Sequence, residues 1–397
     1  MKNWQNSGPK KTITLNEPQW SEARVAAAKS VSVLPSEIVP IAECIDRTLA
    51  RDLISLVDLP AYKTSAMDGY AVAGEGPWKI VGDVKAGAPM KQTLVDKTAV
   101  RIATGAVIPE GTFGIIRWEN SVVTNAELVG DVIADGDIRL AGLECQKGEV
   151  IANSGTVLSP AWIGLLSAAG LDSLEVTRKP RVEIVLLGDE LQLKGVPANG
   201  LVRDSLGPQL PAWITRMGAE VVAMGYITDE ISLVIEAIAG ACTRADVVIT
   251  TGGTADGPRD HLHNALAALG GTLVVDRVKV RPGHPMLLAN LKTALVLGLP
   301  GNPQSAIVAL MTLGEPIFEK LLGRCAKGLE SVITRKEIRT SEGFTRLVLG
   351  NVRSSYFEES EFLGSAMLRG LAQSTGFAVA ANGVNEAGST VLWLPLP

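Results

Sequence analysis

The central part of the chain, residues 179–327, alternates apolar runs with segments of helical spacing. Residues 181–187 and 246–251 are largely apolar, which is typical of strands buried on both faces of a parallel sheet. Helical spacing follows at residues 206–217, 230–240, 261–269 and 304–320. Strands that alternate with helices in this way predict a doubly wound, mostly parallel α/β sheet.

The segments on either side of this part have a shorter period. Before it, brief runs that favour strands are separated by Gly, Pro and Asp, at residues 79–81, 99–102, 114–118 and 132–133. After it, similar runs occur at residues 332–338, 344–352, 376–381 and 390–394. Such spacing predicts one small all-β unit on each side of the α/β part.

The remaining segments predict a domain that is interrupted by the first β unit. Residues 20–28 and 159–171 have helical character, and Ser159 and Pro160 suit a helix start. We therefore expect four parts. They are a mixed α/β domain at 15–60 and 140–178, an inserted β domain at 61–139, an α/β domain at 179–327 and a C-terminal β domain at 328–397.

Composition places the chain among globular proteins, because 46% of its 397 residues are hydrophobic and 20% are charged. We expect no membrane association, since no run of about 18 apolar residues is present. The polar start lacks a secretory pattern, which predicts a cytoplasmic protein. A net charge of −5 argues against a general nucleic-acid binder. It still permits a local basic pocket for a small anion.

Three loops follow predicted strands of the α/β part, at residues 188–190, 252–260 and 298–305. Ligands of open α/β sheets bind beyond the carboxyl ends of the strands. Gly252 and Gly253 would let backbone N–H groups approach a phosphate closely. A tight turn between strand and helix explains the same two glycines equally well.

Acidic residues gather on these loops, among them Glu190, Asp229 and Asp260. Carboxylates beside a phosphate repel it unless a divalent cation lies between them, and Mg²⁺ suits oxygen ligands of this kind. Solvated loop acids are the alternative. Arg281 and His284 lie on a proline-bounded turn, where they suit an oxyanion site or an ordinary surface turn.

Five motifs occur in order along the chain and together resemble one family. They are residues 65–72 (SAMDGYAV), 101–106 (RIATGA), 188–191 (GDEL), 252–253 (GG) and 298–306 (GLPGNPQSA). Single motifs of this kind are weak, whereas five in register are specific. The chain resembles the molybdopterin molybdenumtransferases, which are related to the E domain of gephyrin.

The resemblance implies a fold, an assembly and a reaction. The α/β part would be a Mog-like molybdopterin-binding domain, and the C-terminal part would resemble a β-barrel. The subunits would form a homodimer, with each active cleft shared between the α/β domain of one and the β domain of the other. Adenylylated molybdopterin would lose AMP with the help of Mg²⁺, and its dithiolene would take up molybdate.

The resemblance also implies roles for individual residues. Glu190, Asp229, Asp260 and Thr104 would be catalytic, and Glu190 and Asp260 would hold the metal. The residues implied in substrate binding are Asp68, Arg203, Asp204, Ser205, Gly252, Gly253, Arg281, His284, Pro300, Gly301, Asn302, Pro303 and Ser305.

Three positions depart from the family pattern. Lys63 stands where the family has a carboxylate, Leu143 replaces one acid of a conserved pair, and His284 replaces a lysine. Two functions are therefore compatible with the sequence. One is the molybdenumtransferase itself. The other is an altered paralogue that binds or carries the pterin cofactor or a related nucleotide.

Overall fold

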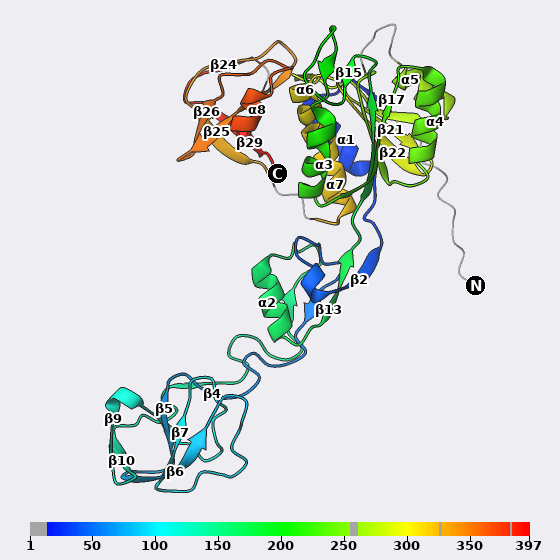
Figure 1. Ribbon diagram of the computed structural model, residues 1–397. Coiled ribbons are helices and arrows are strands. Elements are labelled where there is room, and N and C mark those ends of the chain that lie inside the picture. The colour runs from blue at the N-terminus through cyan, green and yellow to red at the C-terminus, as the bar shows by residue number, and fades with distance from the viewer. Residues whose placement is uncertain (1–13, 255–260, 325–327, 382) are drawn as a thin grey trace, which may run out of the picture. The chain divides into compact units, whose positions relative to one another are not determined.

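The computed structural model describes residues 14–254, 261–324, 328–381 and 383–397 (Figure 1). They form two compact units. One is Ile38–Val176, and the other combines the chain before Ile38 with Thr177–Pro397. Within the described ranges, no helix has both the length and the apolar run needed to cross a membrane.

The α/β part is built on a seven-stranded sheet with the order β1-β19-β21-β22-β18-β14-β17. Its strands are β1 (Leu15–Asn16), β14 (Arg181–Leu187), β17 (Glu220–Ile227), β18 (Val247–Thr251), β19 (Thr272–Asp276), β21 (Leu287–Leu291) and β22 (Ala294–Leu299). Strands β17, β14, β18 and β22 are mutually parallel, which confirms the predicted mostly parallel sheet. Strand β21 runs antiparallel to both of its neighbours and was not predicted.

Helices cover both faces of this sheet, so it is doubly wound as predicted (Figure 1). On one face, Ile184 and Ile249 pack in a core with helices α1 (Trp20–Lys29), α3 (Leu206–Arg216) and α7 (Glu315–Leu321). On the other, Val185 and Val248 pack with α4 (Ile231–Ala241) and α5 (Leu262–Ala268). Alternate residues of each strand therefore face opposite cores, which accounts for their continuous apolar runs.

The predicted helix at residues 304–320 is present but contains a wider turn. Helix α6 (Pro303–Ala309) passes into a π segment (Leu310–Gly314) and then into α7. Pro316 has no backbone N–H to donate to the carbonyl of Thr312, four residues earlier. A local π turn keeps the helix continuous past this lost bond.

The first β domain contains a six-stranded sheet with the order β8-β5-β7-β6-β10-β9. The strands are β5 (Gly69–Val72), β6 (Trp78–Val84), β7 (Thr98–Ile102), β8 (Gly114–Arg117), β9 (Ser121–Thr124) and β10 (Glu127–Gly130). The predicted strand at residues 132–133 is wrong, because these residues lead into a turn. The carbonyl of Ile133 accepts the N–H of Gly136 there. The missed hairpin of β9 and β10 lies just before it.

The rest of this unit is a small mixed core. Helix α2 (Pro160–Ala168) begins as predicted, since the Ser159 hydroxyl accepts the N–H of Trp162 at 3.5 Å. The helix ends three residues before the predicted residue 171, where Gly170 adopts a φ of 87°. Leu158 and Leu166 pack there with residues from β3 (Leu53–Ile54) and β12 (Val150–Ala152).

The C-terminal part is a closed barrel of five strands, which confirms the predicted barrel-like domain. These strands are β23 (Glu330–Thr334), β25 (Thr345–Arg353), β26 (Tyr356–Glu359), β27 (Gly376–Ala380) and β29 (Thr390–Pro395). The barrel closes because β25 pairs with β26 on one side and with β27 on the other. A short strand of the α/β part, β20 (Val280–Arg281), pairs with β25 and so joins the two parts.

Candidate functional site

The carboxyl ends of four parallel strands bring the predicted loops to one edge of the α/β sheet. Glu190 follows β14, Asp229 follows β17, Gly252 follows β18 and Pro300 follows β22. The Gly252 N–H donates to the carbonyl of Leu299 at 2.9 Å, which ties two of the loops together. We call this row of loops the carboxyl edge.

The acids of the carboxyl edge hold one another through backbone groups. The Asp229 N–H donates to Asp189 Oδ1 at 3.1 Å, and the Asp189 N–H donates to Asp229 Oδ2 at 3.4 Å. The Tyr226 hydroxyl donates to the Gly188 carbonyl at 2.5 Å. Burial, followed by the charges of Asp189, Asp229 and Glu190, raises the pKa of Tyr226. The edge therefore carries a negative field.

Carboxylate oxygens in a negative field are the donors that a hard divalent cation prefers, so the residues present are chemically suited to Mg²⁺. No group of three potential ligand side chains converges within the described residues. Asp260, the second predicted metal ligand, lies outside them. The Glu190 carboxylate folds back towards Gly188, where an added Cβ would lie 2.8 Å from Oε2. Its metal role stays a prediction.

The glycine loop and the 203–205 segment show clear structural roles. Gly252 and Gly253 have φ values of 81° and 63°, which only glycine adopts readily, so the turn itself requires them. Asp204 is buried, and its Oδ1 accepts the N–H groups of Leu206 and Gly207 at the start of α3. Arg203 donates to the Gln192 carbonyl at 3.1 Å.

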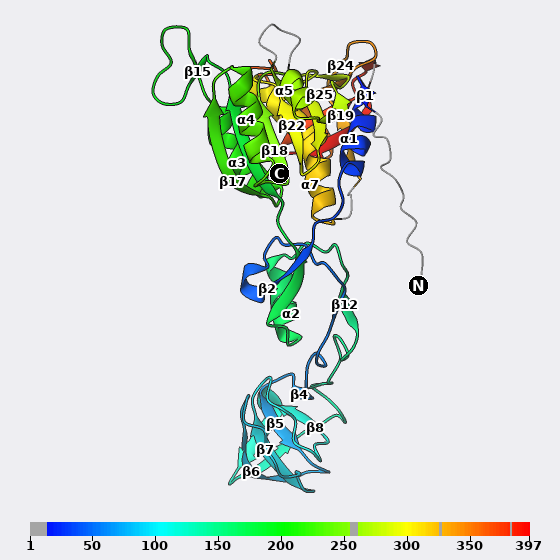
Figure 2. The same cartoon turned by 90° about the vertical axis from the view of Figure 1, so that its right-hand side faces the viewer.

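Arg203 also lies at the base of a loop that projects from the α/β part. Strands β15 (Leu191–Gln192) and β16 (Val202–Arg203) pair at the base, and the segment between them extends away from the sheet (Figure 2). The Gln192 amide group stiffens this segment by donating to the carbonyls of Lys194 and Val196. Ser205 follows this loop directly and precedes α3.

A basic pocket of about 410 Å³ lies where the α/β part meets the barrel. The sequence predicted part of its lining, which comprises Arg281, His284, Pro300, Asn302 and Ser305. Arg346 and Ser365 of the barrel complete it and were missed. Arg346 is the register partner of Arg281 in the β20–β25 pair. Two guanidinium groups from paired strands suit a tetrahedral oxyanion.

Short contacts fix the shape of this basic pocket. The Gln304 N–H donates to the Ser365 carbonyl at 3.0 Å, so the loop of the barrel is held against the start of α6. His284 Nδ1 lies 2.8 Å from the Val278 carbonyl, and its Nε2 lies 3.3 Å from Glu17 Oε1. Both ring nitrogens therefore have partners within the protein. Gly301 and Pro303 shape the adjoining turn and do not line the pocket.

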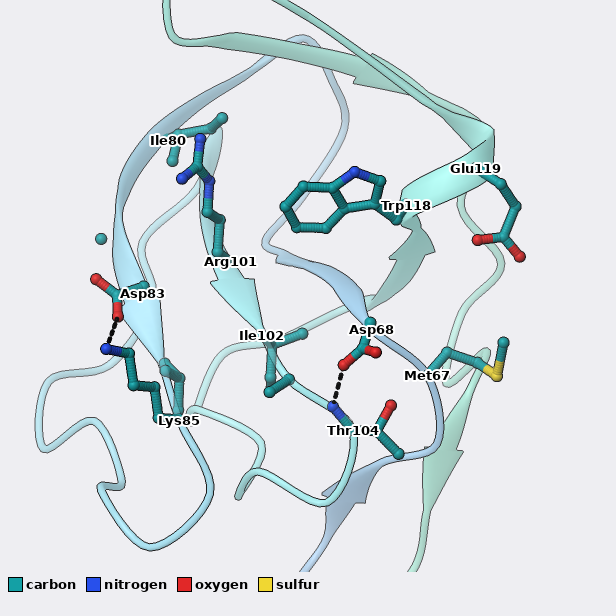
Figure 3. Close-up of a pocket in the computed structure, with 13 residues that line it drawn as sticks. Met67, Asp68, Ile80, Asp83, Lys85, Arg101, Ile102, Thr104, Trp118 and Glu119 are labelled. Carbon is teal, nitrogen blue, oxygen red and sulfur yellow. Dashed lines mark hydrogen bonds and ion pairs between the residues drawn. The ribbon is translucent and has the colours of Figure 1, made fainter.

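The first β domain holds a separate pocket of about 1000 Å³, which we call the β-domain pocket (Figure 3). Asp68 and Thr104 both line it, and the Thr104 N–H donates to Asp68 Oδ1 at 2.7 Å. Gly69 is required beside them, because an added Cβ would lie 2.0 Å from the Ile116 carbonyl oxygen. Arg101 and Trp118 also line the pocket, and neither was predicted to have a role.

Two of the positions that depart from the family pattern lie on the surface of this unit. Lys63 is exposed, and its carbonyl accepts the N–H of Ile108 at 2.9 Å. Leu143 is an exposed leucine. Both side chains therefore lie outside the buried core of this unit.

Comparisons with known proteins agree with this arrangement. Residues 19–170 match the MoeA N-terminal region (domain I and II), and residues 183–320 match a probable molybdopterin binding domain. The molybdopterin molybdenumtransferase of Haemophilus influenzae is 32% identical over 75% of this chain and 77% of its own length. That of a Nostoc species is 34% identical, with coverage of 76% and 72%.

A solved structure resembles the whole fold. The molybdopterin biosynthesis MoeA protein from Pyrococcus horikosii superposes with a TM-score of 0.80 and 25% identity, covering 96% of this chain and 99% of that one. Together with the identity to the curated relatives over most of their length, this settles the family. The chain belongs to the molybdopterin molybdenumtransferases.

Proposed function

We propose that this protein transfers molybdenum from molybdate to adenylylated molybdopterin and releases AMP. The observation that carries the proposal is the basic pocket, where Arg281 and Arg346 face one space beside Pro300 at the carboxyl edge. Molybdate is a tetrahedral dianion, and paired guanidinium groups bind such an anion through charge-assisted hydrogen bonds. Relatives at 32% and 34% identity bear the name of this activity.

The carboxyl edge supplies the second requirement of the reaction, which is a place for a charged pyrophosphate. Glu190 and Asp260 would hold Mg²⁺ there, with Asp229 beside them. When bound, Mg²⁺ neutralises charge on the phosphates. The mutual bonds of Asp189 and Asp229 fix the loops that carry Glu190 and Asp229. Thr104 and Asp68 would contribute from the β-domain pocket.

A second candidate function is binding without turnover. Lys63 favours it, because a cation at a position that is acidic in the family opposes a nearby metal ion. His284 favours it as well, since both of its ring nitrogens have partners within the protein.

A homodimer and a cytoplasmic location complete the proposal. Sedimentation of the pure protein tests the first, and fractionation of cells tests the second.

The decisive experiment incubates the pure protein with adenylylated molybdopterin, Mg²⁺ and molybdate and follows AMP by chromatography. Molybdate-dependent release of AMP is the expected result. Binding of adenylylated molybdopterin without release of AMP would establish the carrier function instead. Absence of both binding and release would refute both functions.

A further inference from the structure

The β-domain pocket contains a tryptophan that the core does not explain. Trp118 follows β8 at the start of a single 3₁₀ turn (Trp118–Asn120), and 54% of its surface is exposed. Exposed tryptophan is unusual, because burial of so large an apolar ring is strongly favourable. Its indole lines the pocket together with Arg101, Asp68 and Thr104 (Figure 3).

Strand register gives this ring a rigid support. Tyr70 in β5 pairs with Arg101 in β7 and with Ile116 in β8, so these three side chains lie on one face of the sheet. Trp118 stacks on Tyr70 with ring centroids 5.4 Å apart and planes 22° from parallel. Tyr70 itself is almost fully buried. One face of the indole is therefore packed against Tyr70, while more than half of the surface of Trp118 stays exposed.

Two charged groups lie next to the ring. The Arg101 guanidinium carbon lies over the Trp118 ring, 5.9 Å from its centroid. Asp68 lies beside the ring, and its Oδ1 accepts the N–H of Thr104 at 2.7 Å. Asp83 lies 3.9 Å from Lys85, so that pair largely neutralises itself. A flat ring with hydrogen-bond donors along one edge would match this combination of a π surface, a carboxylate oxygen and a guanidinium group.

We propose that Trp118 is the stacking platform for the pterin ring of the substrate, a specificity role that rests on the proposed function. A pterin presents an amino group and a ring N–H side by side, and a carboxylate accepts such a pair. Adenine offers only its single amino group on that edge. Asp68 therefore favours the pterin over the adenine. Arg101 lies within reach of the pterin carbonyl or of the phosphate.

Direct binding tests the proposal without turnover. The full-length protein is titrated into 6-hydroxymethylpterin, whose own fluorescence reports stacking, and AMP is tested as a competitor. Trp118→Leu keeps an apolar cover over Tyr70 but removes the π surface, whereas Trp118→Phe keeps part of it. We expect Trp118→Leu to bind the pterin about 5- to 150-fold more weakly, the range found for loss of one stacked base. Trp118→Phe should fall between the two.

Phe113→Ala is the matched control, since Phe113 is an exposed aromatic residue of the same domain outside the pocket. It should bind the pterin as the unaltered protein does. Equal pterin binding by Trp118→Leu and the unaltered protein would overturn the proposal. The proposal would also be overturned if AMP displaced the pterin and this competition became weaker in Trp118→Leu. Trp118 would then stack on adenine.

The same preparations are assayed for AMP release, so the two proposals can fail separately. If the unaltered protein turns over and the Trp118 variants bind the pterin equally well, the stacking role of Trp118 is refuted and the proposed function stands. Pterin binding that depends on Trp118 without any turnover refutes the transferase and supports the platform. Absence of pterin binding by the unaltered protein refutes the platform.

Discussion

Aspartate and glutamate side chains lie at both ends of the α/β sheet, but their ion pairs with arginine differ between the two ends. At the amino ends of the strands, the Arg178 guanidinium grips Asp246 with two contacts of 2.7 Å. Arg244 grips Glu183 in the same manner, at 2.7 Å and 3.0 Å. At the carboxyl edge, no lysine or arginine among the described residues forms an ion pair with Glu190 or Asp229.

The pKa shifts express this difference. Burial alone would raise the pKa of Asp246, but the bonds from Arg178 and the Arg181 N–H outweigh it and lower that pKa. At the carboxyl edge the acids instead help burial to raise the pKa of Tyr226. The acids at the amino ends are therefore neutralised by arginine and stabilise the fold. The carboxyl edge instead has a net negative charge that a cation would neutralise.

The largest effect on turnover is expected from Glu190→Gln, which removes one charge from the carboxyl edge and keeps its shape. AMP release should fall by about 100-fold or more, as with loss of one group aimed at developing charge. Turnover is measured against Mg²⁺ concentration, with a thermal melt to check folding. Glu230→Gln is the control, because Glu230 is an adjacent acid that accepts a bond from Ser232. Equal activity of both variants would show that the open acids are not functional.

A smaller loss is expected from Arg346→Ala in the basic pocket. Loss of one charge-assisted contact costs about 1.5–3 kcal/mol, which corresponds to about a 10- to 150-fold higher KM for molybdate. The KM for adenylylated molybdopterin should stay unchanged. Arg353→Ala is the matched control, because Arg353 ends the same strand and is exposed. An unchanged KM for molybdate in Arg346→Ala would contradict the oxyanion role of this pocket.

The basic pocket also shows where sequence reasoning reaches its limit. Arg281 and His284 could be found because their turn has a local signature of proline and glycine. Arg346 and Ser365 could not, because they join the pocket only through the β20–β25 pairing and the contact with α6. Trp118 was missed for a related reason. As a sequence position it ends a strand, and only the register that places Tyr70 beneath it reveals an exposed ring.

The fold itself was easier to predict than the site. A strand that is buried on both faces is a continuous apolar run in the sequence, so the bounds of β14 were predicted correctly. Strand β21 was missed because Ala289 and Asn290 do not favour strands, and the chain reverses into β22 after only two residues, Lys292 and Thr293. The wider turn before Pro316 follows from a single missing N–H, which helical spacing alone does not report.

A modest gain is expected from Lys63→Asp, which restores the charge that the family carries at this position. A favourable surface charge of this kind is worth about 1 kcal/mol, so Mg²⁺-dependent turnover should rise about fivefold. Lys91→Asp, an exposed lysine of the same unit, controls for overall charge. The gain should shrink in high salt, because surface charges are screened. Equal gains in both variants would show a nonspecific effect of net charge.

Asp246→Asn should leave turnover unchanged and lower stability instead, which is the strictest test of the difference between the two ends. The variant leaves Arg178 without its carboxylate, and we expect a loss of about 1–2 kcal/mol after allowance for solvent screening. Glu220→Gln, a change at the exposed first residue of strand β17, should lose little. Urea denaturation of both variants measures the difference.

The pH dependence of that stability follows from the lowered pKa of Asp246. A carboxyl group with a lower pKa in the folded state stabilises the fold above its unfolded pKa of about 3.9, and the contribution disappears as the pH falls through the folded value. The unaltered protein should therefore lose its advantage over Asp246→Asn only below about pH 4. If the difference in free energy of unfolding between the two proteins is instead constant down to pH 2, Arg178 contributes through packing. The ion pair would then not be what stabilises the amino ends of the strands.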